Sequence, residues 1–173
     1  MMKKDSYSKG SSMKGLIFTI IILIIWVFIP SNLFSQNSSD HKTRRAIHHM
    51  LDDWHGLAAV GDSTYFDHFD ENSFYLGTDA KEVWGLQEFK DFALPHFRKG
   101  SAWSFKKKNR NIYLGKYGHY AWVDETLDTW LGLCRGTGVL EKQGDEWVIM
   151  HYSLTVLVSN KIIKDYVKLL ENQ

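Results

Sequence analysis

Cysteine is almost absent from this chain of 173 residues, because Cys134 is the only one. A single cysteine excludes an intrachain disulfide, and it excludes the zinc sites that need several thiolates. The surrounding sequence LGLCRGTG is typical of a glycine-rich strand, in which a small buried cysteine is more common than a reactive one. No intrachain disulfide is therefore possible, and a structural role is expected for Cys134.

The chain also lacks an excess of either charge. Its 21 Lys and Arg residues nearly balance its 20 Asp and Glu residues. Residues 1–36 carry four lysines and one acid, so the 137 residues that follow have a formal charge of −2. Nucleic-acid-binding domains usually present a basic face, whereas the longest basic run here is Lys106–Lys108. No nucleic acid is therefore expected as a partner.

No apolar run is long enough for an ordinary membrane-spanning helix. The longest, Leu16–Ile29, has 14 residues, whereas a span needs about 20. Lysines precede this run, and Pro30 and small polar residues follow it, which is the pattern of a secretory signal peptide. We therefore expect residues 1–36 to be a signal peptide and the protein to be exported, either periplasmic or secreted. The alternative is an uncleaved segment that anchors the protein in a membrane.

The rest of the chain divides into a helical half and a strand half. Apolar residues recur at spacings of three and four, which predicts helices over 40–60, 62–70 and 85–98. A first strand is predicted at 72–77. After Gly100 the period changes to two, and short breaks imply antiparallel hairpins among strands at 102–114, 119–128, 129–142 and 146–158. Helices gathered on one side of an antiparallel sheet predict a single α+β domain.

The domain boundaries follow from the same patterns. Residues 37–43 are expected to be a polar linker and residues 44–158 the folded domain. Residues 159–173 form a tail with apolar side chains at helical spacing. This tail is expected to be a fourth helix that docks on the outside of the domain or serves as a partner helix.

Six short segments between about residues 42 and 158 carry a family resemblance. They are LDDWHGLAAVGDSTYFDHF, GTD, WGLQEFKDF, YAWVDETLD, CRGTGVL and EWVIMHYSLT. In this order they resemble a SnoaL-like domain of the nuclear-transport-factor-2-like (cystatin-like) superfamily. The resemblance implies a cone of three helices packed on a curved antiparallel sheet, with a pocket between them and a homodimer through the outer sheet face. It fixes no activity, because the superfamily includes isomerases, dehydratases, cyclases, association domains and noncatalytic pocket proteins.

The alternation in the strand HYAWVDETLD singles out Asp124. This carboxylate shares a face with Tyr120 and Trp122, and an acid between aromatic walls is a feature of small-molecule pockets. A desolvated Asp124 would have a raised pKa and could act as a general base or proton donor. The alternative is a structural ion pair between Asp124 and Arg110 or Arg135.

Three further polar residues lie in apolar strand patterns. Arg135 either pairs with Asp124 or Glu125 on the neighbouring strand or binds the carboxylate of an acidic ligand. Strict alternation places His151 on the face of Trp147 and Ile149, where a structural role is expected. The same alternation places Tyr152 on the opposite face, from which its hydroxyl could donate into the pocket.

The segment YLGTDAKEVWG joins the first strand to the third helix and, in a SnoaL-like layout, lies at the wide end of the cone. Asp79 is either a turn residue whose side chain bonds backbone N–H groups or an acid that faces the ligand. Trp84 and Trp103 are expected in the pocket or at its rim, because one small core cannot bury all seven tryptophans.

No cofactor and no metal are expected. His48, Asp52 and His55 have the helical spacing i, i+4 and i+7 that could hold zinc. They border the apolar stripe of their helix, however, and this position predicts a solvated flank.

The function expected from these patterns is that of an exported pocket protein that binds a small apolar or weakly acidic molecule. One alternative is an acid–base enzyme, an isomerase, dehydratase or cyclase, that uses Asp124 with Tyr152 or Asp79. The other alternative is a noncatalytic module for dimerisation.

Overall fold

The computed structural model describes residues 32–100 and 102–171. The apolar run Leu16–Ile29, and with it most of the predicted signal peptide, lies outside these residues. Among the described residues, those from Asp40 onward belong to one compact unit, and residues 32–39 are not part of it. None of the helices in the two described ranges combines the length and the apolar character that crossing a membrane requires.

The helices and strands follow one another in an order close to the predicted one. They are the helix α2 (Asn32–Val60), the 3-10 helix η1 (Ser63–His68), the strands β1 (Phe69–Leu76) and β2 (Val83–Gly85), the helix α3 (Leu86–Phe97), the strands β3 (Lys106–Leu114), β4 (Tyr120–Thr129), β5 (Gly132–Gln143) and β6 (Glu146–Val156), and the helix α4 (Ile163–Glu171).

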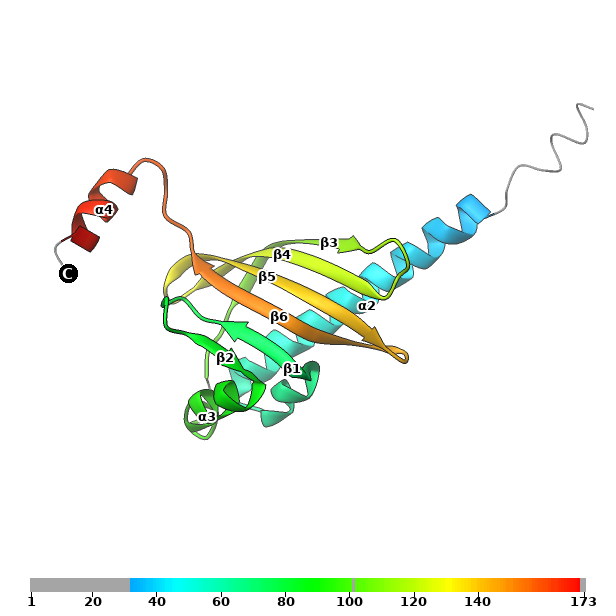
Figure 1. Cartoon of the computed structure of the whole chain (residues 1–173), viewed down its shortest axis with the longest axis horizontal. Coiled ribbons are helices and arrows are strands. Elements are labelled where there is room, and N and C mark those ends of the chain that lie inside the picture. The colour runs from blue at the N-terminus through cyan, green and yellow to red at the C-terminus, as the bar shows by residue number, and fades with distance from the viewer. Residues whose placement is uncertain (1–31, 101, 172–173) are drawn as a thin grey trace, which may run out of the picture. The chain divides into compact units, whose positions relative to one another are not determined.

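All six strands belong to one sheet in the order β2-β1-β6-β5-β4-β3 (Figure 1). Strands β3 to β6 are joined as consecutive antiparallel hairpins, as predicted. Gly132 and Gly144 have positive φ angles of 92° and 63° at two of the hairpin turns, a backbone conformation that glycine adopts without strain. Strand β1 adds a parallel pairing with β6 and an antiparallel pairing with the short β2.

One face of the sheet packs against α2, η1 and α3 to form the core. The buried apolar residues of the helices are Ile47, Leu51, Trp54, Ala58, Tyr65, Phe66, Phe89, Ala93 and Phe97. Those of the central strands include Val123, Leu127, Cys134, Leu140, Ile149, Tyr152 and Leu154. Helices on one face of a largely antiparallel sheet confirm the predicted α+β fold.

Side chains along β4 alternate between the two faces of the sheet, but the face that points toward the helices is the opposite of the one predicted. The side chains that face the helices are those of Ala121, Val123, Glu125 and Leu127. Tyr120 and Trp122 are 49% and 50% exposed, and Asp124 lies with them on the outer face. The prediction that the Asp124 face lines the cone is wrong, because the apolar face packs against the apolar helices and Glu125 finds its partners there.

A β-bulge in β6 changes the phase of its alternation. Leu140 of β5 pairs with Ile149, and the preceding Val139 pairs with His151, so Met150 is the extra residue. Because one additional residue reverses the faces that follow it, Tyr152 is buried on the same side as Ile149. The predicted assignment of His151 and Tyr152 to faces is therefore wrong.

Two element boundaries also differ from the prediction. Helix α2 begins at Asn32, so residues 37–43 are helical and do not form a separate linker. Strand β2 was not predicted, because three residues are too few to show a period. The predicted C-terminal helix is present as α4, and all of its residues are exposed.

Candidate functional site

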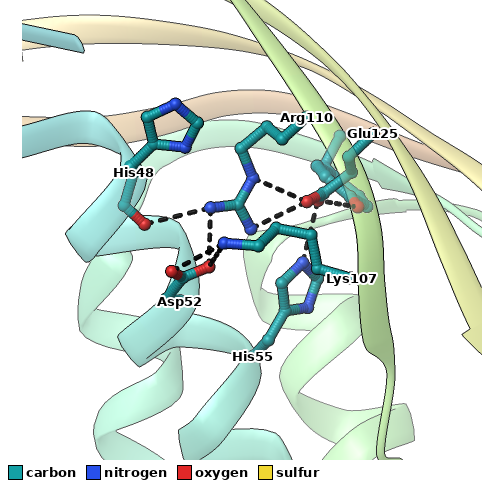
Figure 2. Close-up of polar contacts among 7 residues, drawn as sticks. His48, Asp52, His55, Lys107, Arg110 and Glu125 are labelled. Atoms are coloured by element: carbon teal, nitrogen blue, oxygen red, sulfur yellow. Dashed lines mark hydrogen bonds and ion pairs between the residues drawn. The ribbon is translucent and has the colours of Figure 1, made fainter. Parts of the chain in front are cut away.

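A buried polar network connects α2 to the strands, and Glu125 is its centre (Figure 2). Oε1 of Glu125 accepts a hydrogen bond from the Tyr152 hydroxyl at 2.7 Å and lies 2.8 Å from Nε2 of His55. Oε2 accepts a hydrogen bond from Nε of Arg110 at 2.8 Å and lies 2.7 Å from Nη2 of the same guanidinium. Partners on both oxygens offset the cost of removing this carboxylate from water.

The second half of the network surrounds Asp52 on α2. Nη1 of Arg110 donates to Oδ1 of Asp52 at 2.7 Å and to the carbonyl oxygen of His48 at 3.0 Å. Lys107 donates to the same carboxylate at 2.7 Å. Positive and negative side chains therefore alternate from Lys107 through Asp52 and Arg110 to Glu125, and they fasten α2 to β3 and β4.

This network changes the interpretation of the three polar residues on α2. His55 is only 8% exposed, so the prediction of a solvated flank is wrong for this residue, because its ring reaches the buried Glu125. Asp52 faces two cationic side chains. Within residues 32–100 and 102–171, no three His, Cys, Asp or Glu side chains gather in a group that could hold a metal ion.

The pKa shifts in the network favour fixed charges. Burial by itself would raise the pKa of Glu125, but the hydrogen bond and charge of His55 and the charge of Arg110 bring this pKa down to about 2. Burial and the adjacent Glu125 charge raise the pKa of Tyr152 well above its ordinary value. Near neutral pH, Glu125 is therefore an anion and Tyr152 a protonated donor.

Strand β5 makes room for this arrangement with glycine. Gly136 pairs with Glu125 on one side and with Leu154 on the other. A Cβ atom at Gly136 would lie 1.9 Å from the Tyr152 hydroxyl and 3.2 Å from Cγ of Glu125. The absence of a side chain at Gly136 thus lets the Tyr152 hydroxyl reach across β5 to β4.

A separate pocket of about 130 Å³ lies beside the β1–β2 hairpin. Seven of its twelve lining residues are aromatic, and Glu82 is the only charged one. The lining consists of Tyr75, Gly77, Thr78, Glu82, Trp84, Phe89, Phe92, Trp103, Phe105, Trp130, Leu131 and Leu154. Because an apolar cavity of about 150 Å³ holds a benzene-sized molecule, the pocket suits a ligand of similar size.

Stacked rings hold the walls of this aromatic pocket in place. Trp84 of β2 stacks on Phe92 of α3, with ring centroids 4.5 Å apart and planes at 20°. Tyr75 of β1 stacks on Phe89 of α3 at 4.1 Å and 6°. Trp103 packs near Phe89 at 6.0 Å. The short hairpin and α3 thus present preformed ring surfaces, and offset stacking adds to the free energy gained from burial.

The carboxylate of Glu82 is held at the hairpin turn. Its Oε2 accepts a hydrogen bond from the backbone N–H of Asp79 at 3.1 Å. A Cβ atom at Gly77 would lie 2.1 Å from the same oxygen, so the absence of a side chain at Gly77 lets the carboxylate fold over the chain. Burial raises the pKa of the Tyr75 hydroxyl most, and the charge of Glu82 raises it further. The Glu82 charge therefore lies close to the aromatic wall.

The residues predicted from the sequence are distributed over several places. Trp84 and Trp103 line the aromatic pocket, and Tyr152 is buried with Glu125. Asp79 is exposed, and its Oδ1 accepts the backbone N–H of Lys81 at 2.9 Å, as in the turn alternative.

The other predicted residues lie together on the outer face of the sheet. They are Tyr120, Trp122, Asp124 and Arg135. Asp124 accepts hydrogen bonds from Asn111 and Tyr113 at 3.1 Å, and it pairs with neither predicted arginine in these contacts. Trp122 and Asp124 border a groove of about 270 Å³ on this face, and Tyr113 stacks on Trp122 at 6.2 Å.

Sequence reasoning assigned no site role to the two carboxylates that the structure makes prominent. Glu125 stands alone among apolar residues on its strand face, and a charge in that position is a usable signal for a buried partner such as Arg110. Glu82 gave a weaker signal, because its place in the pocket depends on how the hairpin folds back over Gly77.

Comparisons with known proteins agree with this architecture. The family description "SnoaL-like domain" matches residues 47–159. Among curated proteins, none matches the chain. Three solved structures resemble this chain and share 9–14% sequence identity with it. At that level of identity, the resemblance shows only that the fold is the same.

Two of these structures come from Novosphingobium aromaticivorans. An NTF2-like protein with a cystatin-like fold has a TM-score of 0.62 and 9% identity, covering 80% of this chain and 97% of its own. A protein named as a putative scytalone dehydratase has a TM-score of 0.60 and 14% identity, covering 70% and 89%.

The third, from Streptomyces avermitilis, is named as a putative dehydratase of the NTF2-like family. It has a TM-score of 0.59 and 13% identity, and the match covers 70% of this chain and 99% of that one. The match of the family description to most of the folded unit, together with the six-stranded sheet and its helices, leads to one conclusion: the chain belongs to the SnoaL-like domain family.

Proposed function

We propose that the protein binds a small molecule in the aromatic pocket beside the β1–β2 hairpin and does not act on it chemically. The observation that carries this proposal is the set of seven aromatic side chains around a space of about 130 Å³. Apolar and aromatic walls with few polar groups are typical of ligand sites. Trp84 and Trp103 would supply much of the contact surface.

The ionisation and the position of Glu125 support ligand binding rather than acid–base catalysis. A general base works best when its pKa lies near the working pH, whereas the pKa of Glu125 is about 2. Glu125 is also bonded to Arg110, and neither residue is among those that line the pocket. An isomerase, dehydratase or cyclase remains the alternative proposal, and it would need Glu82 as its acid.

The proposal is tested by identifying what co-purifies with the protein. The protein is isolated from its native cell, denatured, and analysed by mass spectrometry for released small molecules. We expect a ligand with the wild-type protein and with the variant Trp122→Ala, whose tryptophan lies on the outer sheet face. The variant Trp84→Ala should lose it. Equal recovery from both variants would overturn the assignment of the pocket.

We further propose that two copies pair through the outer face of the sheet. Exposed aromatic and aliphatic side chains on this face support the pairing, and they include Tyr113, Tyr120, Trp122 and Val139. Surfaces of this composition are common in interfaces.

We also propose that the protein acts outside the cytoplasm after cleavage of its signal peptide. N-terminal sequencing of the protein from its native cell tests this proposal. Finding residues 1–36 intact would contradict the cleavage.

A further inference from the structure

We infer that the ligand of the aromatic pocket is a small organic cation, of the tertiary or quaternary ammonium class. This inference rests on the proposed binding function and narrows it. It differs from the apolar or weakly acidic ligand expected from the sequence, and two independent features of the pocket carry it.

The first feature is the number of aromatic rings that line the pocket. Tyr75, Trp84, Phe89, Phe92, Trp103, Phe105 and Trp130 all line one space. The face of an aromatic ring carries partial negative charge, so a cation placed over it is attracted, most strongly by tryptophan. Three of the seven rings here are indoles. Cages of such rings are the usual protein sites for quaternary ammonium groups.

The second feature is the sign of the only formal charge. Glu82 lines the pocket, and none of the other eleven lining residues is acidic or basic. The hydrogen bond from the Asp79 N–H to Oε2 of Glu82 holds the carboxylate at the hairpin. An anionic ligand would meet this carboxylate and the negative ring faces together. A cation meets an opposite charge and favourable ring faces.

The size of the pocket restricts the cation. A volume of about 130 Å³ is close to that of apolar cavities that take benzene. A trimethylammonium group with a short substituent fits this space, whereas a polyamine or a peptide would extend beyond it. Three compounds of nearly equal shape separate charge from size: choline, the neutral 3,3-dimethylbutan-1-ol and the anionic 3,3-dimethylbutanoate.

The test is a titration of the full-length protein with each of the three compounds. Binding is followed by the NMR signals of the indole N–H groups of Trp84, Trp103 and Trp130. We expect choline to bind about tenfold more tightly than the neutral alcohol, and the anion to bind least. In the variant Glu82→Gln the preference for choline should fall from about tenfold to about threefold, because the aromatic rings remain, while the affinity for the alcohol is retained.

A matched control uses the neighbouring acid of the same hairpin. Asp79 is exposed and does not line the pocket, so the variant Asp79→Asn should keep the preference for choline. Glutamine at position 82 can still accept the Asp79 N–H, which preserves the turn. A circular dichroism spectrum and melting temperature equal to those of the wild type verify that each variant is folded.

The outcomes separate this inference from the proposed function. If the alcohol or the anion shifts the three indole signals with an affinity equal to or above that of choline, the inference that the ligand is a cation is wrong. The proposal that the pocket binds a small molecule would still hold. An equal loss in Glu82→Gln and Asp79→Asn overturns the role given to Glu82. Failure of all three compounds to shift the indoles overturns the inference, while a co-purified ligand lost from Trp84→Ala would still support the pocket.

Discussion

At Glu125 a full negative charge is buried at 0% exposure, and its oxygens contact Tyr152, His55 and Arg110. The carboxylate thus joins β4 to β3, β6 and α2 by polar contacts. Its neighbour Asp124 carries the same functional group on the outer face, where its partners are Asn111 and Tyr113. The pair offers a comparison of the same chemical change in two environments.

The variant Glu125→Gln should lose about 3–5 kcal/mol of free energy of unfolding, because Arg110 is left buried without its counter-charge. The control Asp124→Asn should change this free energy by no more than about 0.5 kcal/mol, as is usual for an exposed site. Urea denaturation of both variants measures the difference. Similar values for the two would contradict the account of the buried network.

The ionisation of Glu125 should also contribute to the pH dependence of the free energy of unfolding. The pKa of Glu125 is about 2 in the fold and 4.5 as the ordinary value, so the unfolded chain takes up the proton first as the pH falls. The contribution of Glu125 is complete above about pH 4.5 and is lost toward pH 2, amounting to about 3 kcal/mol. Because Glu125→Gln lacks it, the stability difference from the wild type should shrink on acidification. A difference that stays constant from about pH 6 to pH 3 would contradict the shift.

At the scale of elements, strand β5 depends on having no side chain at Gly136. The variant Gly136→Ala should lower the free energy of unfolding by about 1–3 kcal/mol, because the new methyl group would displace the Tyr152 hydroxyl from Glu125. Gly56 on α2 has no atom within 4 Å of a built Cβ, so Gly56→Ala should be neutral or stabilising by up to about 1 kcal/mol. Thermal unfolding compares the two, and equal signs would be inconsistent with the packing described.

The elements themselves were largely predictable from the sequence. Helical spacing from Ile47 to Ala58 and the period of two after Gly100 reflect one-sided burial, which is a local property of the chain. Alternation alone does not say which face is inside, so the Asp124 face of β4 was assigned to the pocket incorrectly. The bulge at Met150 could not be anticipated either, because it appears only when β6 is aligned with β5.

The candidate site was predictable only in part. Trp84 and Trp103 were expected near the pocket because the chain has more tryptophan than one small core can bury, and both line it. The Glu125 network escaped notice, because its members come from three distant segments of the chain. His55 and Glu125 are 70 residues apart in the sequence, and only the packing of α2 against the sheet brings Nε2 of His55 to 2.8 Å from Oε1 of Glu125.

At the scale of the whole molecule, the proposed pairing through the outer sheet face predicts a change in oligomeric state. Trp122 is 50% exposed at the groove on this face, and a charge there would have to be desolvated in the interface. The variant Trp122→Lys should therefore sediment as a monomer where the wild type sediments as a dimer. Tyr117→Lys, which replaces an exposed residue in the β3–β4 turn, should leave the dimer intact; dissociation of both or of neither would contradict this interface.

The most direct test of the proposed binding function is an NMR spectrum of the indole N–H groups recorded with benzene-sized neutral, cationic and anionic compounds. The account predicts that at least one compound shifts the signals of Trp84, Trp103 and Trp130, which line the pocket. The signals of Trp54, Trp122 and Trp147, which do not line it, should stay in place. Shifts spread equally over all six indoles, or no shift at the three pocket indoles with any compound, would contradict the claim that this aromatic pocket is the binding site.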